Sequence, residues 1–335
     1  RFLRERFFSL RTYELGRVGR YKINKKFGFN FDDQDEANWV LRSEDIIATV
    51  KYLIELQQGK QTRLDDIDSL SNRRLRQCGE IVSQIAIRPA LARFERMVKE
   101  RMSLISTKEN PSPSQMINPQ PLISSLNSFY RSNQLSSILD RTNPLAELDL
   151  LRRITVVGIG GLTRERAAFS IRDVHNSQYG RICTVRSPEG PNIGLVTYLA
   201  LYAKVNQYGF ILSPFRKVKK INNKYKVSNQ IDYLDADDEY TQHITHLDID
   251  IDKNFYINQK WVPLRYQGEF IEGHVKLVDY IDLVPNQIVG TSASLIPFIN
   301  HDDATRALMG SHMQTQAVPL ISTEAPIVGT GIEST

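Results

Sequence analysis

Apolar residues recur at helical spacing in the first third of the chain. After Ser43 they follow at intervals of three and four residues: Ile46, Ile47, Val50, Leu53, Ile54 and Leu56. Ser43 suits a helix N-cap, the acidic Glu44 and Asp45 suit a first turn, and Gly59 suits a C-terminal stop. The pattern predicts a helix that begins at Ser43, ends before Gly59 and packs its apolar face in a core.

A longer helical pattern covers residues 70–104. Its apolar members are Ile81, Val82, Ile85, Leu91, Phe94, Met97, Val98 and Met102. Pro89 predicts a kink or a break in this helix. The polar face is rich in arginine, which fits either a solvated face with salt bridges or a wall that faces phosphate groups. Residues 105–121 are rich in Ser, Pro and Asn and predict a loop, after which helical spacing resumes.

The second half of the chain changes to strand-like patterns. Short β-branched and aromatic runs broken by Gly and Pro fill residues 154–212, and alternating runs fill residues 213–285. The later segment also carries an acidic cluster, consisting of Asp232, Asp235, Asp237, Asp238 and Glu239. This cluster predicts an outer face turned away from any polyanion. A basic and polar stretch returns at residues 296–319, so the whole pattern predicts an α+β fold with several lobes.

Composition narrows the class of protein only slightly. With 335 residues, 41% hydrophobic and 24% charged, the chain suits two or three globular domains. A net charge of +5 permits nucleic-acid binding without establishing it. Cys78 and Cys183 lie far apart, so neither a disulfide framework nor a cysteine zinc site is expected, and a reducing compartment fits. No apolar run approaches the ~20 residues that cross a bilayer.

Residues 152–192 concentrate chemistry that suits a polyanion. The segment holds Arg152, Arg153, Arg164, Arg166, Arg172 and Arg181. Arginine presents a planar fork of donors that fits phosphate, and glycine lets a backbone come close to a ligand. The glycines at 158–161 lack the Lys-Ser or Lys-Thr ending of a P-loop, so alone they predict a flexible turn. Residues 188–194 predict either a stiff loop presenting Glu189 and Asn192 or a plain strand connection.

Residues 301–316 offer further candidate chemistry. Three consecutive side chains could act as ligands of a hard metal ion: His301, Asp302 and Asp303. Adjacent side chains point in different directions, however, and one of these aspartates could instead cap a helix over residues 304–313. Arg306 could pair with a phosphate, and Gln316 could hydrogen-bond a sugar or a base edge. The chain shows no recognisable nucleophile elbow.

Taken together, these motifs resemble the β subunit of bacterial-type (bacterial or plastid) multisubunit RNA polymerases. The resemblance covers nearly the whole chain. Its ordered motifs are DDID at 65–68, NRR at 72–74, FER at 94–96, KER at 99–101, DRTNPL at 140–145, RRI at 152–154, GGLTRERA at 160–167, RDVH at 172–175, YGR at 179–181, PEGPN at 188–192, YGF at 208–210, ASLIPF at 293–298 and HDDA at 301–304.

The resemblance implies a central fragment of that subunit, which agrees with a first residue, Arg1, that is not Met. The implied domains are the end of the lobe at 1–70, the second part of the protrusion at 71–136, the fork at 137–212, an external β domain at 213–288 and the start of the hybrid-binding domain at 289–335.

The resemblance also implies a role for individual residues. Those expected to line the RNA–DNA hybrid are Ser137, Asp140, Arg153, Pro188, Glu189 and Asn192. Arg164 and Arg166 fall on a fork loop beside downstream DNA. Arg306 matches an arginine near the phosphates of the incoming nucleotide, and Gln316 matches a glutamine near the RNA. In such interfaces we expect arginines to bind phosphates, and short polar side chains to contact sugars and bases.

The chain departs from the family in the rifamycin pocket. Sensitive members usually carry Gln, His and Ser where this chain has Ser137, Leu150 and Thr155, and Val157 replaces a leucine. Each change removes or moves a polar partner, which costs roughly 1–3 kcal/mol for an unpaired group, so the sequence predicts intrinsic rifamycin resistance. Thr315 replaces a common arginine, which puts the phosphate contact expected there in question.

The implied reaction is nucleotidyl transfer, in which an RNA 3′-hydroxyl attacks the α-phosphate of a nucleoside triphosphate and two metal ions assist. Mg²⁺ would be held mainly by the partner β′ subunit, so no catalytic residue is expected here and the fragment alone should be inactive. Expected partners are β′, α, ω, a sigma factor, template DNA, nascent RNA and nucleoside triphosphates, without a membrane, in bacterial cytoplasm (the nucleoid) or plastid stroma. Two other hypotheses are a stand-alone nucleic-acid-binding module and a metal-dependent hydrolase using His301, Asp302 and Asp303.

Overall fold

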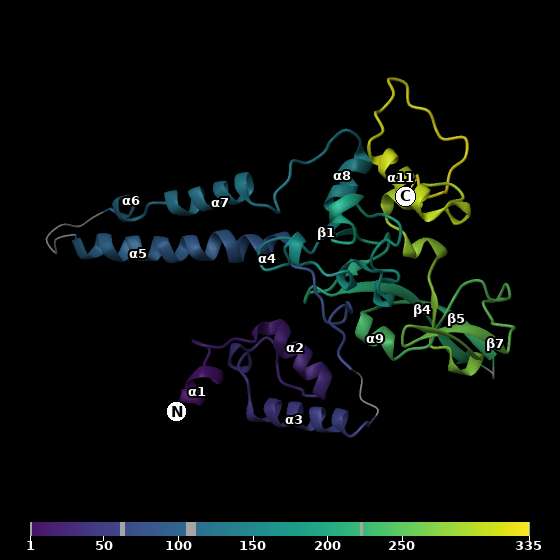
Figure 1. Cartoon of the computed structure of the whole chain (residues 1–335), viewed down its shortest axis with the longest axis horizontal. Helices are drawn as coiled ribbons and strands as arrows, with labels where there is room; N and C mark the ends of the chain where they lie inside the picture. The colour runs from purple at the N-terminus through teal and green to yellow at the C-terminus, as the bar shows by residue number, and fades with distance from the viewer. Residues whose placement is uncertain (1, 61–63, 105–111, 222–223, 335) are drawn as a thin grey trace. The chain divides into compact units, whose positions relative to one another are not determined.

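The fold comes from a computed structural model that describes residues 2–60, 64–104, 112–221 and 224–334 (Figure 1). The chain divides into two compact units, Arg1–Ile67 and Asp68–Thr335. The first is helical, and the second combines helices with a large antiparallel-rich sheet. The predicted α+β class is confirmed.

The first unit is organised around a buried arginine. Its elements are α1 (Phe2–Phe7), α2 (Gly16–Phe27), the 3-10 turn η1 (Glu36–Asn38) and α3 (Ser43–Gln57). Arg20 on α2 is fully buried, and its Nη1 donates to Asp45 Oδ1 at 2.9 Å. Asp45 Oδ2 accepts the backbone N–H of Arg42 at 2.9 Å. One carboxylate therefore caps α3 and neutralises Arg20 at the same time.

Helix α3 has the predicted length, but two details of its prediction are wrong. Arg42, rather than Ser43, occupies the N-cap, because Asp45 takes over the capping interaction. The apolar face is also uncovered: Ile46, Ile47, Val50, Leu53 and Ile54 are between 44% and 68% exposed. Burial requires a second apolar layer, and α3 instead turns Asp45 and Tyr52 toward α2, where the Tyr52 ring meets Phe27 at 6.2 Å.

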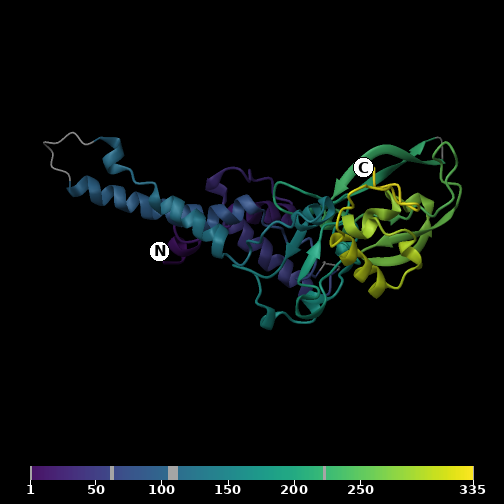
Figure 2. The same ribbon diagram turned by 90° about the horizontal axis from the view of Figure 1, so that it is seen from above.

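The second unit begins with a pair of antiparallel helices. Its elements are α4 (Cys78–Val82), the π-helical turn η2 (Ser83–Ile87), α5 (Arg88–Leu104), α6 (Pro113–Met116) and α7 (Gln120–Ser132). Helices α5 and α7 lie side by side (Figure 1), and Figure 2 shows the long helix α4–η2–α5 from above. The buried cluster consists of Val82 on α4, Ala86 on η2 and Phe129 on α7. The π turn ends just before Pro89, so the helical interruption that the proline predicted lies on its N-terminal side.

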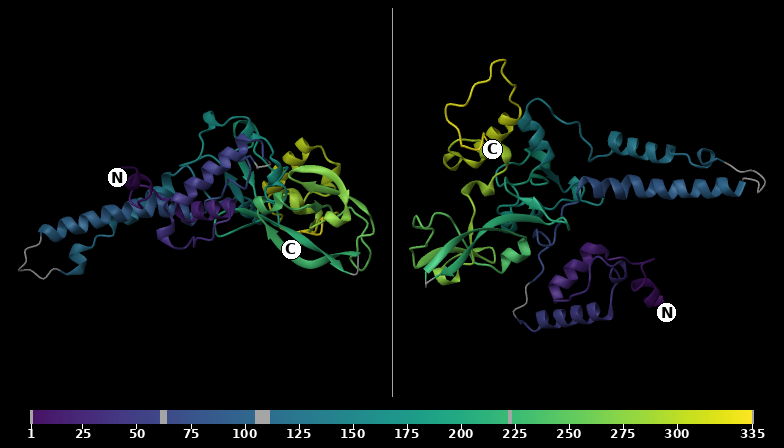
Figure 3. Two further views of the ribbon diagram at one scale, coloured as in Figure 1. Left: turned by 90° about the horizontal axis from the view of Figure 1, so that it is seen from below. Right: turned by 180° about the vertical axis from the view of Figure 1, so that it is seen from behind.

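Two sheets follow in the second unit. Helix α8 (Pro144–Leu151) leads into β1 (Arg153–Thr155), which pairs antiparallel with β2 (Val196–Tyr198). Within the described residues the larger sheet has seven strands: β3 (Lys204–Val205), β4 (Ile211–Ile221), β5 (Lys224–Leu234), β6 (Ile244–Thr245), β7 (Trp261–Tyr266), β8 (Glu269–His274) and β9 (Tyr280–Asp282). Strands β4 and β5 form a long twisted hairpin (Figure 3). The sheet's main core includes Val218, Val227, Leu264 and Ile281.

The chain closes with short helices that return to β1 and β2. They are α10 (Thr291–Ser294), the 3-10 turn η9 (Ile299–His301) and α11 (Ala304–Thr315), whereas α9 (Ala236–Tyr240) follows β5 within the region of the large sheet. Asp303 caps α11, because its Oδ2 accepts the Thr305 N–H at 3.1 Å. The predicted helix cap is therefore confirmed, and this carboxylate has a structural partner.

Candidate nucleic-acid interface

The arginines of residues 152–192 divide into buried braces and exposed groups. Arg152 is half-buried and donates through Nη2 to the carbonyls of Ala200 and Leu201, the latter at 3.2 Å. Burial lowers the pKa of its guanidinium. Arg181 is fully buried and donates through Nε to the Ile211 carbonyl at 3.0 Å. The expectation that both arginines belong to a polyanion surface is wrong, because both guanidiniums make hydrogen bonds within the chain itself.

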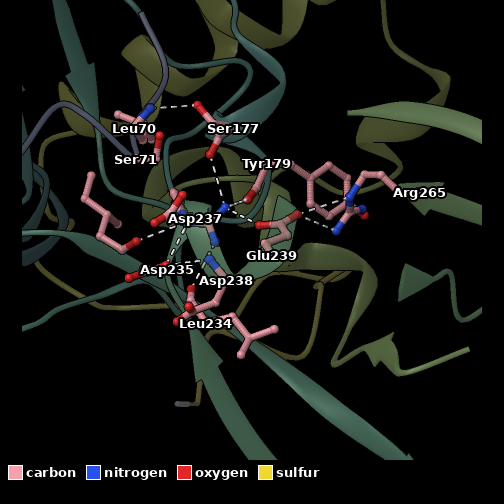
Figure 4. Close-up of polar contacts among 12 residues, drawn as sticks. Leu70, Ser71, Ser177, Tyr179, Leu234, Asp235, Asp237, Asp238, Glu239 and Arg265 are labelled. Carbon is pink, nitrogen blue, oxygen red and sulfur yellow. Dashed lines mark hydrogen bonds and ion pairs between the residues drawn. The ribbon is translucent and has the colours of Figure 1, made fainter. Parts of the chain in front are cut away.

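Arg181 belongs to a network that joins the 175–182 segment to the large sheet (Figure 4). Its Nη1 pairs with Glu239, whose other carboxylate oxygen lies 3.0 Å from Arg265 Nη2. The Arg265 guanidinium lies 3.6 Å from the centre of the Tyr179 ring, and the Tyr179 hydroxyl donates to Asp282 at 2.7 Å. Burial and the nearby Asp282 carboxylate raise the pKa of Tyr179. These side chains bond to one another inside the fold and do not form a ligand-binding surface.

This network corrects the prediction of an acidic outer face. The Glu239 side chain is 13% exposed and is shared between two arginines. The buried Asp235 caps α9 by accepting the N–H groups of Asp237 and Asp238 at 3.0 and 2.8 Å. These two carboxylates face inward because each has a buried or backbone donor to satisfy. Asp238 is exposed and agrees with the original expectation.

Arg172 holds the turn at residues 188–194. Its Nη1 donates to the carbonyls of Pro191 and Ile193 at 2.8 and 2.9 Å. A Cβ added to Gly194 would lie 2.4 Å from the Arg172 carbonyl oxygen, so glycine permits the close approach. Residues Gly190–Asn192 form the 3-10 turn η6. Of the three predicted site residues in this turn, Glu189 is exposed, whereas Pro188 and Asn192 are half-buried.

The glycines at 158–161 also allow other parts of the chain to approach their backbone closely. Arg76 Nη2 donates to the Ile159 carbonyl at 2.7 Å, and a Cβ on Gly160 would lie 3.1 Å from the same guanidinium. A Cβ on Gly161 would lie 2.4 Å from the Val156 carbonyl oxygen. The predicted turn is present, and an arginine of the same chain approaches its backbone.

Strand β1 and the turn after it carry several predicted residues. Arg153 and Thr155 are exposed on β1, while Leu150 on α8 and Val157 are half-buried. Backbone bonds of 3.0 Å join Val156 N to the Leu195 carbonyl and Leu162 N to the Val156 carbonyl. The structure thereby brings the β1 residues next to the end of the 188–194 turn.

Asp140 and Gln316 lie on segments that Asn143 ties together. Asn143 caps α8 through its Oδ1, and its Nδ2 donates to the carbonyls of Thr315 and Ala317 at 3.0 and 2.7 Å. Those carbonyls flank the exposed Gln316. Asp140 accepts the hydroxyl and N–H of Thr142 at 2.6 and 2.9 Å, which lowers the pKa of its carboxyl. Ser137, upstream of them, is exposed.

A buried ion pair fixes the same region from within. Arg186 and Asp149 have side chains only 5% and 7% exposed, and Nη2 lies 2.9 Å from Oδ2. The other Asp149 oxygen lies 3.3 Å from the Ser292 hydroxyl on α10. Sequence reasoning missed this pair. The local sequence gives no clear signal for it, because Glu147 and Thr184 interrupt the apolar runs around the two charges.

Four exposed arginines remain available on the predicted surface. Arg153 lies on β1, Arg164 and Arg166 lie on the 3-10 turn η3 (Arg164–Arg166), and Arg306 lies on α11. Within the residues that the structure describes, none has a carboxylate partner, and Arg306 makes only a 3.8 Å contact to the Met309 sulfur. Unpaired guanidiniums at the surface can bind phosphate without first breaking an internal ion pair.

The candidate metal ligands do not converge. Among residues 2–60, 64–104, 112–221 and 224–334, no group of three or more His, Cys, Asp or Glu side chains could hold a metal ion. The described helices also include none that is long and apolar enough to cross a membrane.

Three family models for pieces of one protein match the chain in order. They are described as RNA polymerase Rpb2, domain 2, at residues 1–76; RNA polymerase Rpb2, domain 3, at 137–205; and RNA polymerase beta subunit external 1 domain, at 215–283. Curated relatives extend the match across 99% of the chain. Those of Nostoc sp. and Syntrophomonas wolfei are 48% identical, and that of Prochlorococcus marinus is 49% identical. Each of these relatives is named DNA-directed RNA polymerase subunit beta.

The chain belongs to the RNA polymerase β-subunit family. The resemblance predicted from the motifs is confirmed. The chain spans only 29–30% of the length of these relatives. The implied domain boundaries and residue roles stay predictions.

Proposed function

We propose that the chain forms part of the wall of the RNA–DNA hybrid channel, and the fork beside downstream DNA, in a multisubunit DNA-directed RNA polymerase. The observation that carries the proposal is the set of exposed arginines without internal carboxylate partners, Arg153, Arg164, Arg166 and Arg306, on a frame braced by buried arginines. Nucleic-acid backbones are recognised by such groups irrespective of base sequence.

The hybrid-facing part of the proposal rests on β1 and its neighbours. Arg153 can hold a phosphate, while Glu189 and Asn192 offer short polar groups to sugar hydroxyls or base edges. Arg172 holds the turn that carries both residues, so their positions are fixed before nucleic acid binds. Pre-organised contacts lose less conformational entropy on binding. Ser137 and Asp140 extend the same surface from the α8 side.

The downstream and nucleotide contacts rest on two other elements. Arg164 and Arg166 stand on one 3-10 turn, where two guanidiniums can meet adjacent phosphates of downstream DNA. Arg306 on α11 meets the phosphates of the incoming nucleoside triphosphate, and Gln316 at the end of α11 contacts the RNA. Both residues belong to the element that Asn143 ties to α8.

The chain contributes binding and orientation, and the chemistry resides elsewhere. We place the Mg²⁺ ions, which stabilise the attacking and leaving oxygens, mainly on the partner β′ subunit, as the resemblance to the polymerase family implies. The fragment alone is then inactive. The assembly includes β′, α, ω and a sigma factor, with template DNA and nascent RNA, in the bacterial nucleoid or the plastid stroma.

The test uses a complete polymerase whose β subunit carries this chain. Arg153→Ala is expected to shorten the lifetime of stalled elongation complexes and to flatten its salt dependence, since one phosphate contact is lost. Arg306→Ala is expected to raise the KM for nucleoside triphosphates. Arg131→Ala, which removes an exposed charge from α7, is the matched control and should change neither quantity. Unchanged complex lifetime and KM in the first two variants refute the proposal.

The stand-alone nucleic-acid-binding hypothesis makes a different prediction. Under it, the isolated chain binds an RNA–DNA hybrid as tightly as the assembled polymerase does, and Arg306→Ala changes binding without any effect on a nucleotide KM. The hydrolase hypothesis has no structural support, because Asp303 is engaged as the cap of α11.

A further inference from the structure

The Arg186 guanidinium sits where four separate segments meet. Its Nη2 lies 2.9 Å from Asp149 Oδ2 on α8 and 3.2 Å from Thr315 Oγ1 on α11, and its Nη1 lies 3.4 Å from Ser311 Oγ. The guanidinium carbon is also 5.1 Å from the centre of the Tyr198 ring on β2. Arg186 lies on the segment that leads into the 188–194 turn. Its side chain therefore contacts α8, β2 and two successive turns of α11.

This ion pair is poorly explained by stability alone. Arg186 Nε is buried and has no hydrogen-bond partner within the part of the chain that the structure describes. Moving two charges out of water costs free energy, and an ion pair with an unsatisfied donor recovers only part of that cost. Apolar side chains of similar volume often give a fold equal stability. A forked guanidinium adds direction, because its two donors fix the rotation and height of α11 relative to α8.

The contacts on α11 lie on the side opposite to the proposed ligand groups. Ser311 and Thr315 are buried, while Arg306 on the same helix and Gln316, the residue that follows its last turn, are exposed. A rigid helix transmits the placement of its buried face to its exposed face. Fixing Ser311 and Thr315 therefore fixes where Arg306 and Gln316 stand relative to β1 and Asp140.

We propose that Arg186 is a positioning residue, which locks α11 to Asp149 on α8 and so holds the Arg306 guanidinium in register for the incoming nucleoside triphosphate. This positioning role rests on the proposed function, because it explains how Arg306 is held for the nucleotide contact proposed above. The site holds one guanidinium for one carboxylate, so a second arginine at position 315 is incompatible with Arg186.

The first test compares two buried arginines in the complete polymerase. Arg186→Met keeps most of the side-chain volume but loses both donors, and it should raise the KM for nucleoside triphosphates about tenfold or more, since a displacement near 1 Å can cost up to ~100-fold. Arg265→Met removes a similarly buried, ion-paired guanidinium from the large sheet and is the matched control. Its KM should stay within about twofold of the parent's, whatever it does to stability.

A double variant tests whether Arg186 acts through Arg306. If it does, Arg186→Met combined with Arg306→Ala has the same KM as Arg306→Ala alone, because the misplaced group is already gone. Arg186→Lys retains a cation for Asp149 but cannot also reach Thr315, so its KM should lie between those of the parent and Arg186→Met. This variant provides the test if Arg186→Met does not fold.

Charge placement gives an independent check. Thr315→Arg should raise the KM as Arg186→Met does, because two guanidiniums then share Asp149. Adding Arg186→Glu to Thr315→Arg should restore part of the lost function by pairing the new arginine. Equal KM values for Arg186→Met and Arg265→Met, or multiplying effects in the double variant with Arg306→Ala, overturn the positioning role. An unchanged KM in Arg306→Ala instead refutes the proposed nucleotide contact itself.

Discussion

The Arg172 guanidinium donates to the Pro191 carbonyl across 2.8 Å, and this bond closes the turn that carries Glu189 and Asn192. The same Nη1 also reaches the Ile193 carbonyl at 2.9 Å. The sequence around Arg172 predicts a phosphate ligand, but its guanidinium instead donates to backbone carbonyls of the same chain. Exposed arginines such as Arg164 have no such internal acceptor in the described part of the chain.

Removing this clamp should loosen the turn. Arg172→Ala leaves the Pro191 and Ile193 carbonyls without their charged donor, a contact worth about 1.5–3 kcal/mol, and amide hydrogen exchange across Gly190–Asn192 should accelerate. Arg164→Ala removes the same charge from η3 and should leave these amides unchanged while weakening binding to downstream DNA. Equal exchange in the two variants would mean that the turn is held by other contacts.

The two glycines of the turn should respond differently to a methyl group. Gly190 and Gly194 both have positive φ angles, 81° and 72°, so alanine costs about 1–2 kcal/mol at either position. At Gly194 the new Cβ would also lie 2.4 Å from the Arg172 carbonyl oxygen, whereas at Gly190 nothing lies within 4 Å. Gly194→Ala should therefore destabilise the chain by about 1–3 kcal/mol more than Gly190→Ala.

Thermal or denaturant unfolding of the two glycine variants measures that difference. Similar losses for both would show that the backbone around Arg172 yields to the methyl group. The comparison isolates the close approach, because the conformational penalty of a positive φ is common to both positions.

Periodicity predicted the elements, and chemistry within the chain decided the roles of single residues. The helix from Ser43 follows from its apolar spacing and the helix after Asp303 follows from its capping aspartate, and both are local properties. The uncovered face of α3 does not, because exposure depends on which other surface is present. The large sheet's order, with β6 parallel to β9 and antiparallel to β7, depends on long-range pairing that no local pattern encodes.

The candidate site shows the same division. Exposed residues such as Arg153 and Arg306 were identified by their resemblance to a family, and the structure leaves them accessible. Arg181 and Arg186 could not be separated from them by sequence, because a guanidinium serves a buried carboxylate as readily as a phosphate. Only the positions of Glu239 and Asp149, distant in sequence, show which arginines are braces.

The network around Glu239 should be a major source of stability for the second unit. Arg265→Met removes the buried cation that lies 3.0 Å from Glu239 and 3.7 Å from Asp282, and breaking a buried ion pair in this way costs about 3–5 kcal/mol. Denaturant unfolding measures the loss. The exposed pair of Lys99 and Glu95 on α5 is the control, since Lys99→Met should change the unfolding free energy by less than about 1 kcal/mol. Comparable losses would contradict the network's structural role.

Protonation of His312 should weaken the fold at mildly acidic pH. Burial, and next the positive charge of Arg186, lower the pKa of its imidazole from 6.5. The unfolded chain therefore binds this proton more readily, and stability falls as pH decreases through the ordinary histidine value toward the lowered one. His312→Gln should reduce that part of the pH dependence of unfolding, whereas substituting the exposed His301 is the control. A pH profile identical to the parent's would exclude His312 as its origin.

A polymerase that contains this chain should resist rifamycins. Ser137, Leu150 and Thr155 stand where sensitive family members usually have Gln, His and Ser. Leu150 supplies no polar group, and the Thr155 hydroxyl accepts the Val157 N–H at 3.1 Å within its own turn. A drug hydroxyl left without its partner loses roughly 1–3 kcal/mol per contact, or about 5- to 150-fold in affinity.

Restoring the polar groups provides the decisive comparison. The combined variant Ser137→Gln, Leu150→His and Thr155→Ser should lower the rifampicin concentration that halves RNA synthesis, with the largest single contribution from Leu150→His because it introduces a donor where none exists. Ser136→Gln changes the neighbouring position, whose hydroxyl donates to the Phe129 carbonyl at 3.0 Å, and should not sensitise the enzyme. Inhibition of the unmodified polymerase at concentrations that stop sensitive bacterial enzymes would refute the prediction, because the missing partners would then carry no binding energy.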